Sequence, residues 1–297
     1  MKFAAIDIGS NAVRLLLTNV IEDAGPPLFK KETLVRLPLR LGADAFSLGR
    51  ISDDKIERLV EAVIGFKHLI RAYPALDYMA MATSAMRVAE NGAEVAAIVD
   101  ERAGILFDII DGQTEAEVIY ANHIEDRLDP DKNYFYVDVG GGSTEISVIV
   151  NHNVVACGSF AIGTVRALGD GIDPTEWRSM KSWLMEHTAD HRPIVGIGSG
   201  GNINKIFKIS RIKDGSPISY KRLKKMHKYL SSFTLDERIS RLRLRPDRAD
   251  VIIPASEIYL SVMKWSRAKI MYVPQFGLSD GMIHVLYDRY RARTGVE

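Results

Sequence analysis

Residues 134–147 read YFYVDVGGGSTEIS, and the rest of the chain is best interpreted from this stretch. Strand-forming residues run up to Asp138, three glycines follow at positions 140–142, and an alternating apolar run begins at Ile146. Glycine has no Cβ and readily adopts φ > 0, so successive backbone N–H groups in such a turn can point at an anion. The pattern predicts a strand–turn–strand device that binds an anionic group. A glycine-rich hairpin without a ligand is the competing interpretation.

The polar residues around these glycines extend the candidate anion site. Ser143 and Thr144 add hydroxyl donors. Asp138 and Glu145 add negative charge, which only a metal ion would reconcile with a bound phosphate. Asp138 and Glu145 are therefore candidate metal ligands, and the candidate phosphate-binding residues are Gly140, Gly141, Gly142, Ser143 and Thr144.

The same plan occurs at the amino terminus. An apolar strand over residues 3–7 ends at Asp7, the turn contains Gly9, Ser10 and Asn11, and a second strand follows from Val13. Two copies of one device suggest two similarly built domains that face one another, with a phosphate-binding turn on each side of a cleft. An ordinary hairpin turn is the alternative interpretation of Ser10 and Asn11.

Ser84 and Arg87 are candidates for a further phosphate contact. They follow an expected strand over residues 78–81 and stand at the start of a helix. Hydroxyl and amide groups at a helix N-terminus favour an anion, and the guanidinium of Arg87 is a forked donor suited to phosphate. Capping of the helix by Thr83 or Ser84 alone is an equally good explanation.

Glu115 is the candidate general base. We expect a strand over residues 105–110 and then a helix that begins near Thr114, with Glu117 completing a capping box. That leaves Glu115 in the first helical turn at the carboxyl end of a strand, where ligands bind in open α/β sheets. The helix dipole there favours the ionised carboxylate that a general base requires. A surface glutamate is the competing interpretation.

Two features of the second half also favour anions. Residues 198–202 (GSGGN) form another glycine turn that opens a helix, and Gly200 could contact a further phosphate or a nucleotide, or merely connect strand and helix. Residues 205–248 contain 14 Lys and Arg against 4 Asp and Glu, whereas the remainder has 25 against 34. Such a segment attracts a polyanion, although a solvated helical face is the alternative. Its tightest cluster is Lys221, Arg222, Lys224, Lys225 and Lys228.

Length and composition limit the remaining possibilities. At 297 residues the chain exceeds the size at which single cores stop growing, so we expect two domains, separated near the polar stretch 126–133. We expect neither a membrane span nor a signal peptide. The single cysteine, Cys157, fits a reducing cytoplasm, and we expect it to be a buried small hydrophobe.

Taken together, these stretches resemble the exopolyphosphatase and guanosine pentaphosphate phosphohydrolase (Ppx/GppA) family. The resemblance covers essentially the whole chain, and its motifs occur in the order of that family. They are DIGSNAVRL (7–15), ATSAMRVAEN (82–91), IIDGQTEAE (109–117), VDVGGGSTE (137–145), SFAIGTVR (159–166), GIGSGGN (196–202), RADVII (248–253) and FGLSDG (276–281).

The resemblance implies an α/β fold of two ribonuclease H-like domains flanking a cleft, as in the actin, hexokinase and heat-shock ATPase superfamily. We expect these domains over residues 1–124 and 125–281, with a carboxyl-terminal helix over 282–297 packing back on the first. The implied localisation is cytoplasmic, the partners include neither nucleic acid nor membrane, and a homodimer is implied by the resemblance alone.

The implied activity is that of a hydrolase: a Mg²⁺-dependent exopolyphosphatase that releases orthophosphate from the end of inorganic polyphosphate. A monovalent cation such as K⁺ is a second candidate cofactor. The alternatives are removal of the 5′ γ-phosphate of guanosine pentaphosphate, which would connect the protein to the stringent response, an ATP-dependent kinase of the same fold, and a non-catalytic nucleotide-binding protein.

The resemblance also implies roles for individual residues. Glu115 corresponds to the general base, Glu145 is a second catalytic candidate, and the implied metal ligands are Asp7, Asp138 and Glu145. The implied substrate contacts are Gly9, Ser10, Asn11, Arg14, Ser84, Arg87, Gly140, Gly141, Gly142, Ser143, Thr144 and Gly200. The chain departs from the family pattern at Ala12, where a hydroxyl residue is frequent, and at Ser279-Asp280, which replace an Arg-Glu pair.

Overall fold

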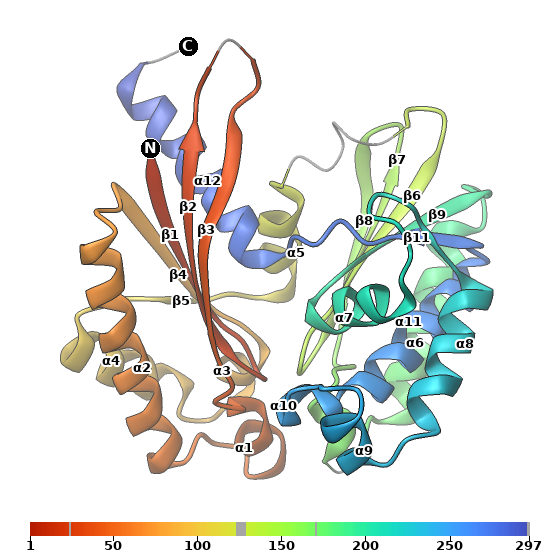
Figure 1. The fold of residues 1–297 in the computed structure, drawn as a ribbon, viewed down its shortest axis with the longest axis horizontal. Helices are drawn as coiled ribbons and strands as arrows, with labels where there is room; N and C mark the ends of the chain where they lie inside the picture. Colours follow the sequence, from red (N-terminus) through yellow and green to blue (C-terminus); the bar gives the residue numbers. More distant parts are fainter. Residues whose placement is uncertain (24, 123–128, 170, 296–297) are drawn as a thin grey trace. The chain divides into compact units, whose positions relative to one another are not determined.

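A computed structural model describes residues 1–23, 25–122, 129–169 and 171–295 (Figure 1). The chain divides into two compact units. Unit 1 comprises Met1–Asn122 and Gly277–Glu297, and unit 2 comprises His123–Phe276. The expected domain boundary between residues 124 and 125 lies outside the described residues.

Unit 1 is built on a five-stranded sheet in the order β3-β2-β1-β4-β5. The first three strands form an antiparallel meander, and β4 and β5 run parallel to β1. The strands are β1 (Lys2–Ile8), β2 (Val13–Ile21), β3 (Leu28–Leu37), β4 (Asp77–Ala82) and β5 (Asp108–Ile109). The expected strand over residues 105–110 is therefore reduced to two residues.

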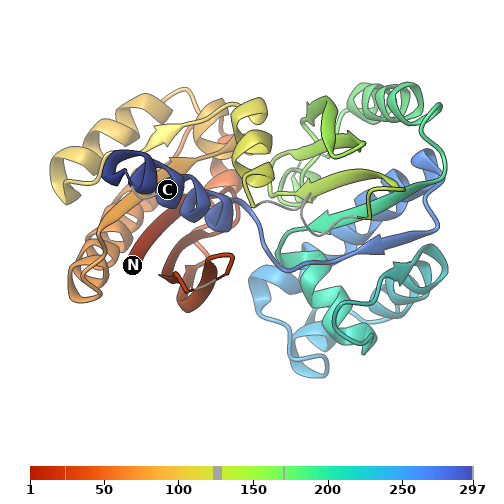
Figure 2. The same ribbon diagram turned by 90° about the horizontal axis from the view of Figure 1, so that it is seen from above.

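Helices cover both faces of this sheet (Figures 1 and 2). Because side chains alternate along a strand, Ala4, Ile6 and Ile8 of β1 join a core with α2 and α4, whereas Phe3 points to the other face. There Phe3 packs edge-to-face on Tyr290 of α12, with ring centroids 5.9 Å apart. The helices of unit 1 are α1 (Leu41–Ser47), α2 (Asp53–Ala72), α3 (Ser84–Val88), α4 (Gly92–Ala103), α5 (Gly112–Tyr120) and α12 (Leu278–Thr294).

The carboxyl-terminal helix belongs to unit 1 and begins earlier than position 282, at Leu278. Asp280 explains this start, because its Oδ2 accepts a hydrogen bond from the Gly277 N–H at 3.0 Å and so caps the helix. Its Oδ1 lies 2.7 Å from Lys31 Nζ of β3. Burial raises the pKa of Asp280 in spite of this cation. The residue that departs from the family pattern thus has a structural role, capping α12 and pairing with β3.

Unit 2 repeats the same plan. Its sheet has the order β10-β11-β9-β6-β7-β8, in which β6, β7 and β8 form an antiparallel meander and β9 runs parallel to β6. The strands are β6 (Asn133–Val139), β7 (Thr144–Val150), β8 (Asn153–Phe160), β9 (Ile194–Ser199), β10 (Ile218–Ser219) and β11 (Ile270–Tyr272). The helices are η2 (Arg166–Leu168), α6 (Pro174–Thr188), α7 (Gly201–Ser210), α8 (Tyr220–Ser231), α9 (Leu235–Ser240), α10 (Pro246–Ala249) and α11 (Ile252–Ser266).

The repeated strand order confirms the expected fold class. In each unit a meander of three strands is followed by strands parallel to the first, so β3-β2-β1-β4-β5 corresponds to β8-β7-β6-β9-β11. In each unit an Asp-x-Gly sequence joins the first two strands. The duplication inferred from two short motifs is therefore a duplication of whole domains.

Two smaller expectations have different outcomes. Cys157 is exposed, because β8 is an edge strand and the face of β8 that carries Cys157 is open to solvent. The prediction of a buried cysteine was therefore wrong. Within the described residues, no helix combines the length and the apolar character needed to cross a membrane.

Candidate functional site

The turn between β1 and β2 carries Gly9, Ser10 and Asn11. The Gly9 N–H donates to Ala12 O at 3.2 Å, and a Cβ at Gly9 would lie 3.1 Å from that oxygen. Glycine is favoured here by this close backbone approach and not by a positive φ. The carbonyl oxygens of Ser10 and Asn11 accept hydrogen bonds from the N–H groups of Gly42 (2.8 Å) and Arg40 (3.1 Å), at the start of α1.

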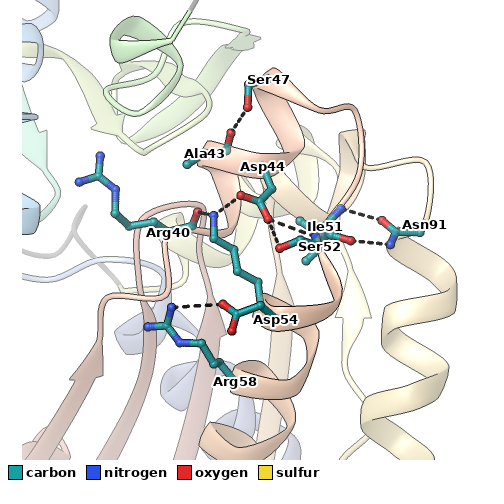
Figure 3. A network of polar contacts seen from close by, with 10 residues as sticks. Arg40, Ala43, Asp44, Ser47, Ile51, Ser52, Asp54, Arg58 and Asn91 are labelled. Atoms are coloured by element: carbon teal, nitrogen blue, oxygen red, sulfur yellow. Dashed lines mark hydrogen bonds and ion pairs between the residues drawn. The ribbon is translucent and has the colours of Figure 1, made fainter.

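A polar network anchors α1 and thereby this turn (Figure 3). Asp44 of α1 accepts hydrogen bonds from Lys55 Nζ, from Ser52 Oγ and, at 3.1 Å, from the Ser52 N–H. Burial disfavours its charge, but these hydrogen bonds prevail and lower the pKa of Asp44. Asn91 bonds to both backbone groups of Ile51, at 2.8 and 2.9 Å. The Ser10–Asn11 turn therefore rests on a fixed support.

Asp7 and Arg14 face each other across the hairpin. They are register partners on β1 and β2, and Arg14 Nη1 donates to Asp7 Oδ2. Asp7 is buried, with 3% of its surface exposed, so this pair neutralises a carboxylate that would otherwise be costly to bury. Asp7 as a metal ligand and Arg14 as a substrate contact remain predictions, and each would require the pair to share its charge with a second partner.

Arg87 and Glu115 come together beside the ends of β4 and β5. Arg87 Nη1 donates to Ile110 O at 2.5 Å and lies 3.7 Å from Glu115 Oε2. Glu115 has only 7% of its surface exposed. Ser84 is also buried, in the first turn of α3, where the Thr83 N–H donates to Ile8 O at the end of β1. The carboxyl ends of three neighbouring strands thus bring these residues together, as expected for an α/β ligand site.

The start of α5 differs from the sequence expectation. Its N-cap is Asp111, which accepts a hydrogen bond from the Thr114 N–H at 2.7 Å, and the helix begins at Gly112. The capping box from Thr114 to Glu117 was therefore wrong, and Glu117 instead accepts a hydrogen bond from Gln113. The sequence supports both caps, since Asp111 and Thr114 are both good N-cap residues, and the backbone path after β5 decides between them.

Helix α12 fixes the position of α5. A Cβ at Gly281 of α12 would lie 1.8 Å from Val118 O of α5, so the two helices meet without a side chain between them. The Asn122 amide, just after α5, donates to Gly277 O at 3.3 Å. The carboxyl-terminal helix consequently supports the helix that carries Glu115.

We expect the Asp111 cap to contribute to the stability of unit 1 and to make that contribution depend on pH. Hydrogen bonds from Thr114, the backbone N–H first, hold the pKa of Asp111 below its ordinary value. Because the folded-state pKa is depressed, the stability that this carboxylate contributes is present above its unfolded pKa and is lost as the pH falls through the folded pKa.

Asp111→Ala should therefore lower the melting temperature, whereas Asp111→Asn keeps an acceptor for Thr114 and should retain most of the stability. From about pH 7 to about pH 3, Asp111→Asn should lose less stability than the wild type. Thermal unfolding across this range measures both effects. An unchanged pH dependence in Asp111→Asn would contradict the assignment.

In unit 2, the turn after β6 is held by its carbonyl oxygens. Gly140 O and Gly141 O accept hydrogen bonds from the N–H groups of Thr164 (3.0 Å) and Val165 (2.7 Å), and Gly142 O accepts one from Arg166 Nε (3.0 Å). Of the N–H groups of residues 140–143, the hydrogen bonds of the described residues use only that of Gly140, which donates to Ser143 O. The N–H groups of residues 141–143 are thus left for another acceptor, such as a phosphate oxygen.

The loop that holds this turn was not assigned a role from the sequence. A Cβ at Gly163 would lie 2.4 Å from Gly141 O and from two backbone atoms of Gly142, so only glycine permits the contact. The motif SFAIGTVR contained this glycine, but the sequence does not show which backbone it approaches. Gly140 itself lacks the positive φ that we expected, and a Cβ there would lie 3.2 Å from Ser143 O.

Asp138 and Glu145 are register partners on β6 and β7. They occupy the positions that Asp7 and Arg14 occupy in unit 1, but here two carboxylates face each other. Like charges directly opposite on a sheet are destabilising, so a cation between them would be favourable. Glu145 is 2% exposed, and its Oε1 accepts a hydrogen bond from Ser159 Oγ at 3.0 Å.

Tyr259 of α11 is a further residue of this site that sequence reasoning missed. Its hydroxyl donates to Ser199 O, at the end of β9 and beside Asp138 in the register. Complete burial, and after it the negative charge of Asp138, raise the pKa of Tyr259 well above its ordinary value. No local sequence signal marks this tyrosine, because it reaches the site through the packing of α11.

The glycine turn before α7 borders the same carboxylate. Gly200 has φ 111°, a conformation that favours glycine, and a Cβ there would lie 2.9 Å from Asp138 Oδ1. The phosphate contact proposed for Gly200 remains a prediction. Thr144 donates its hydroxyl to Ile162 O at 2.6 Å, so its side chain already closes the hairpin onto the next loop.

The donor set fits Mg²⁺ better than a metal held by protein alone. Among the described residues no group of three or more His, Cys, Asp or Glu side chains could enclose an ion. Mg²⁺ keeps several waters and is commonly bound through one or two carboxylates together with substrate phosphates. The facing pair Asp138 and Glu145, beside a turn suited to phosphate, meets that requirement.

The class of protein follows from the fold and these turns: an α/β protein with two ribonuclease H-like domains, as in actin and hexokinase, with an Asp-x-Gly turn in each. Residues 26–289 match the model of the Ppx/GppA phosphatase family. The chain belongs to the Ppx/GppA phosphatase family, which confirms the resemblance seen in the sequence.

Individual relatives agree with this assignment. Exopolyphosphatase 1 of Mycobacterium tuberculosis is 23% identical, and the match covers 95% of this chain and 87% of that protein. The guanosine-5'-triphosphate,3'-diphosphate pyrophosphatase of Photobacterium profundum is 22% identical over 97% of this chain and 60% of its own length. The crystal structure of an exopolyphosphatase from Cytophaga hutchinsonii has the same fold, with a TM-score of 0.83, 21% identity and coverage of 97% and 98%. Family members with these names are phosphoanhydride hydrolases.

Proposed function

We propose that this protein hydrolyses the terminal phosphoanhydride bond of inorganic polyphosphate and releases orthophosphate. The observation that carries the proposal is the turn at residues 140–143. The carbonyl oxygens of the three glycines accept hydrogen bonds from residues 164–166, the N–H groups of residues 141–143 are left for an anion, and two facing carboxylates stand beside the turn. A phosphate would accept hydrogen bonds from these N–H groups, and a divalent cation would offset the charge of the two carboxylates.

Asp138 and Glu145 would hold Mg²⁺, which would supply positive charge against the phosphate oxygens. The protein's own contribution is positioning and electrostatics, because phosphoryl transfer requires little covalent chemistry from the enzyme. The N–H groups at residues 141–143 would orient the terminal phosphate. In unit 1, Ser10 and Asn11 are placed on a supported turn that could contact phosphate in the same way.

Glu115 is the proposed general base. It is a nearly buried carboxylate, in the first turn of α5, and Arg87 at 3.7 Å offsets its charge. Glu115 would take a proton from, or orient, the water that attacks the terminal phosphorus in line with the leaving oxygen. A positioned base of this kind contributes about 10²–10⁴-fold to the rate.

Removal of guanosine pentaphosphate's terminal 5′ phosphate is the second candidate. The Photobacterium relative, which aligns with 97% of this chain, supports it, because its name describes a guanosine nucleotide pyrophosphatase. The chemistry at the reacting phosphorus is the same, so the two substrates differ in what binds the leaving group.

Phosphate release with each substrate tests the proposal directly. With Mg²⁺ we expect inorganic polyphosphate to yield orthophosphate with the higher kcat/KM, and addition of EDTA to abolish release. Asp138→Asn should raise the Mg²⁺ concentration needed for half-maximal rate, because one of the two facing carboxylates is lost. Higher kcat/KM with guanosine pentaphosphate would favour the second candidate, and no orthophosphate from either substrate would refute both.

A further inference from the structure

A pocket of about 590 Å³ lies in unit 2 beside residues 204–208 of α7 and the residues around α10. This volume is typical of sites for small ligands, which are about 300–1,000 Å³. Five of the ten described residues that line it are basic, and one is acidic, Asp214. The basic residues are Lys205, Lys208, Arg243, Arg245 and Arg248.

These five residues are a subset of the basic residues in the segment 205–248. Lys205 and Lys208 stand three positions apart on α7, and Arg243 and Arg245 come from the connection between α9 and α10. The tightest cluster in the sequence is elsewhere, since Lys221, Lys224, Lys225 and Lys228 are exposed on α8 and do not line the pocket. Tertiary packing has therefore gathered cations that are distant in sequence.

The cations of the pocket repel one another. Burial lowers the pKa of Lys205, and the nearby charges of Arg248 and Lys208 lower it further. In the part of the chain that the structure describes, none of the ion pairs involves Lys205, Lys208, Arg243 or Arg245. Mutual repulsion lowers stability unless an anion offsets it, so the pocket is suited to a ligand with several negative charges.

Backbone strain occurs at the same place. Arg243 and Gln275, which both line the pocket, have φ angles of 51° and 62°. These angles lie in the left-handed region of the backbone, which residues other than glycine and asparagine rarely adopt. Strained residues of this kind persist where the surrounding structure holds them, and they cluster at ligand sites.

Arg248 connects the pocket to the candidate phosphate site. A Cβ at Gly201 would lie 2.9 Å from Arg248 Nη2, so the guanidinium rests against the glycine turn before α7. A Cβ at the preceding glycine, Gly200, would likewise lie 2.9 Å from Asp138 Oδ1. Successive residues of one turn therefore border the proposed metal ligand on one side and the basic pocket on the other.

A nucleobase is a poor occupant. Phe207 is the one aromatic residue among the ten described lining residues, and it is 3% exposed, within the hydrophobic core. Bases of single-stranded nucleic acids are commonly bound by stacking on exposed aromatic faces, and the described lining of this pocket offers none. Five basic side chains with a single carboxylate match an extended chain of phosphates instead.

We infer that this pocket binds the internal phosphates of a linear polyphosphate chain whose terminal phosphate occupies the turn at residues 140–143. The inference rests on the proposed function for the identity of the ligand. It goes further in assigning a second, separate set of contacts that would distinguish a long chain from a short one.

Binding of medium-chain inorganic polyphosphate in EDTA, measured by calorimetry at several salt concentrations, tests the inference without turnover. The pocket variant combines Lys205→Gln, Lys208→Gln and Arg245→Gln. The matched control combines Lys221→Gln, Lys224→Gln and Lys225→Gln on α8, and removes the same charge from the same segment. At low salt we expect the pocket variant to bind at least about 10-fold more weakly, and the slope of log K against log salt to fall by about 2. The control should bind like the wild type.

Kinetics provide a second measurement. The pocket variant should raise KM for long polyphosphate while leaving kcat, and KM for inorganic tripolyphosphate, near their wild-type values. Equal losses in both variants would show a diffuse charge effect and overturn the inference, as would displacement of polyphosphate by guanosine alone. If no substrate releases orthophosphate but the binding difference persists, the proposed function fails and the polyphosphate site stands.

Discussion

Glu115→Gln should lower kcat for orthophosphate release by about 10²–10⁴-fold. Glutamine keeps the size of the side chain and its hydrogen-bonding oxygen but cannot accept the proton of the attacking water. Binding of polyphosphate should persist, because Glu115 is not among the residues proposed to hold phosphate. Steady-state kinetics combined with calorimetric titration separate the two effects.

Glu117→Gln is the matched control, two residues further along α5 from its N-cap. Glu117 is exposed, and its carboxylate accepts a hydrogen bond from Gln113 at 3.0 Å. Its removal should leave kcat within about twofold, as expected for an exposed side chain away from the chemistry. Wild-type turnover in Glu115→Gln would exclude Glu115 as the base, and equal losses in both variants would indicate an effect on α5 as a whole.

Gly163→Ala should have the second largest effect. The new methyl group would lie 2.4 Å from Gly141 O and from backbone atoms of Gly142, so either the turn or the loop must shift. Overpacking of this kind costs about 1–3 kcal/mol of stability. A shift of about 1 Å in groups that position a substrate can lower the rate about 10²-fold. We therefore expect a lower melting temperature together with a strong loss of kcat/KM.

The control for Gly163→Ala is Leu168→Ala, in the short helix that follows the same loop. Leu168 is 43% exposed, so its truncation should change neither the turn nor the activity measurably. Thermal unfolding and phosphate release, measured on the same samples, distinguish lost stability from lost geometry. Wild-type kcat/KM in a folded Gly163→Ala protein would show that the turn at residues 140–143 does not position the substrate.

The sequence was most informative where chemistry is local. Two Asp-x-Gly turns between alternating apolar runs predicted two strand–turn–strand devices, and the structure has them at β1–β2 and β6–β7. The strand expected over residues 78–81 is present in the same way, as β4. These features depend on neighbours within a few positions, which is the range over which sequence patterns act.

Local rules failed where the choice depended on distant backbone. Asp111 rather than Thr114 caps α5, Cys157 lies on the open face of an edge strand, and Gly9 is favoured by a close backbone contact rather than by its φ. In each case the residue type was compatible with both outcomes. The backbone path of a segment distant in the sequence determined the outcome, and residues close in the sequence do not specify that path.

By itself, the sequence determined that this is a duplicated α/β protein of the Ppx/GppA family with an Asp-x-Gly turn in each half. Only the tertiary structure decided that Asp7 faces Arg14 whereas Asp138 faces Glu145, that Gly163 supports the turn at residues 140–143, and that five of the 14 basic residues at positions 205–248 line one pocket. Strand register and helix packing join residues that are far apart in the chain, and the charge that each group meets after folding depends on those partners.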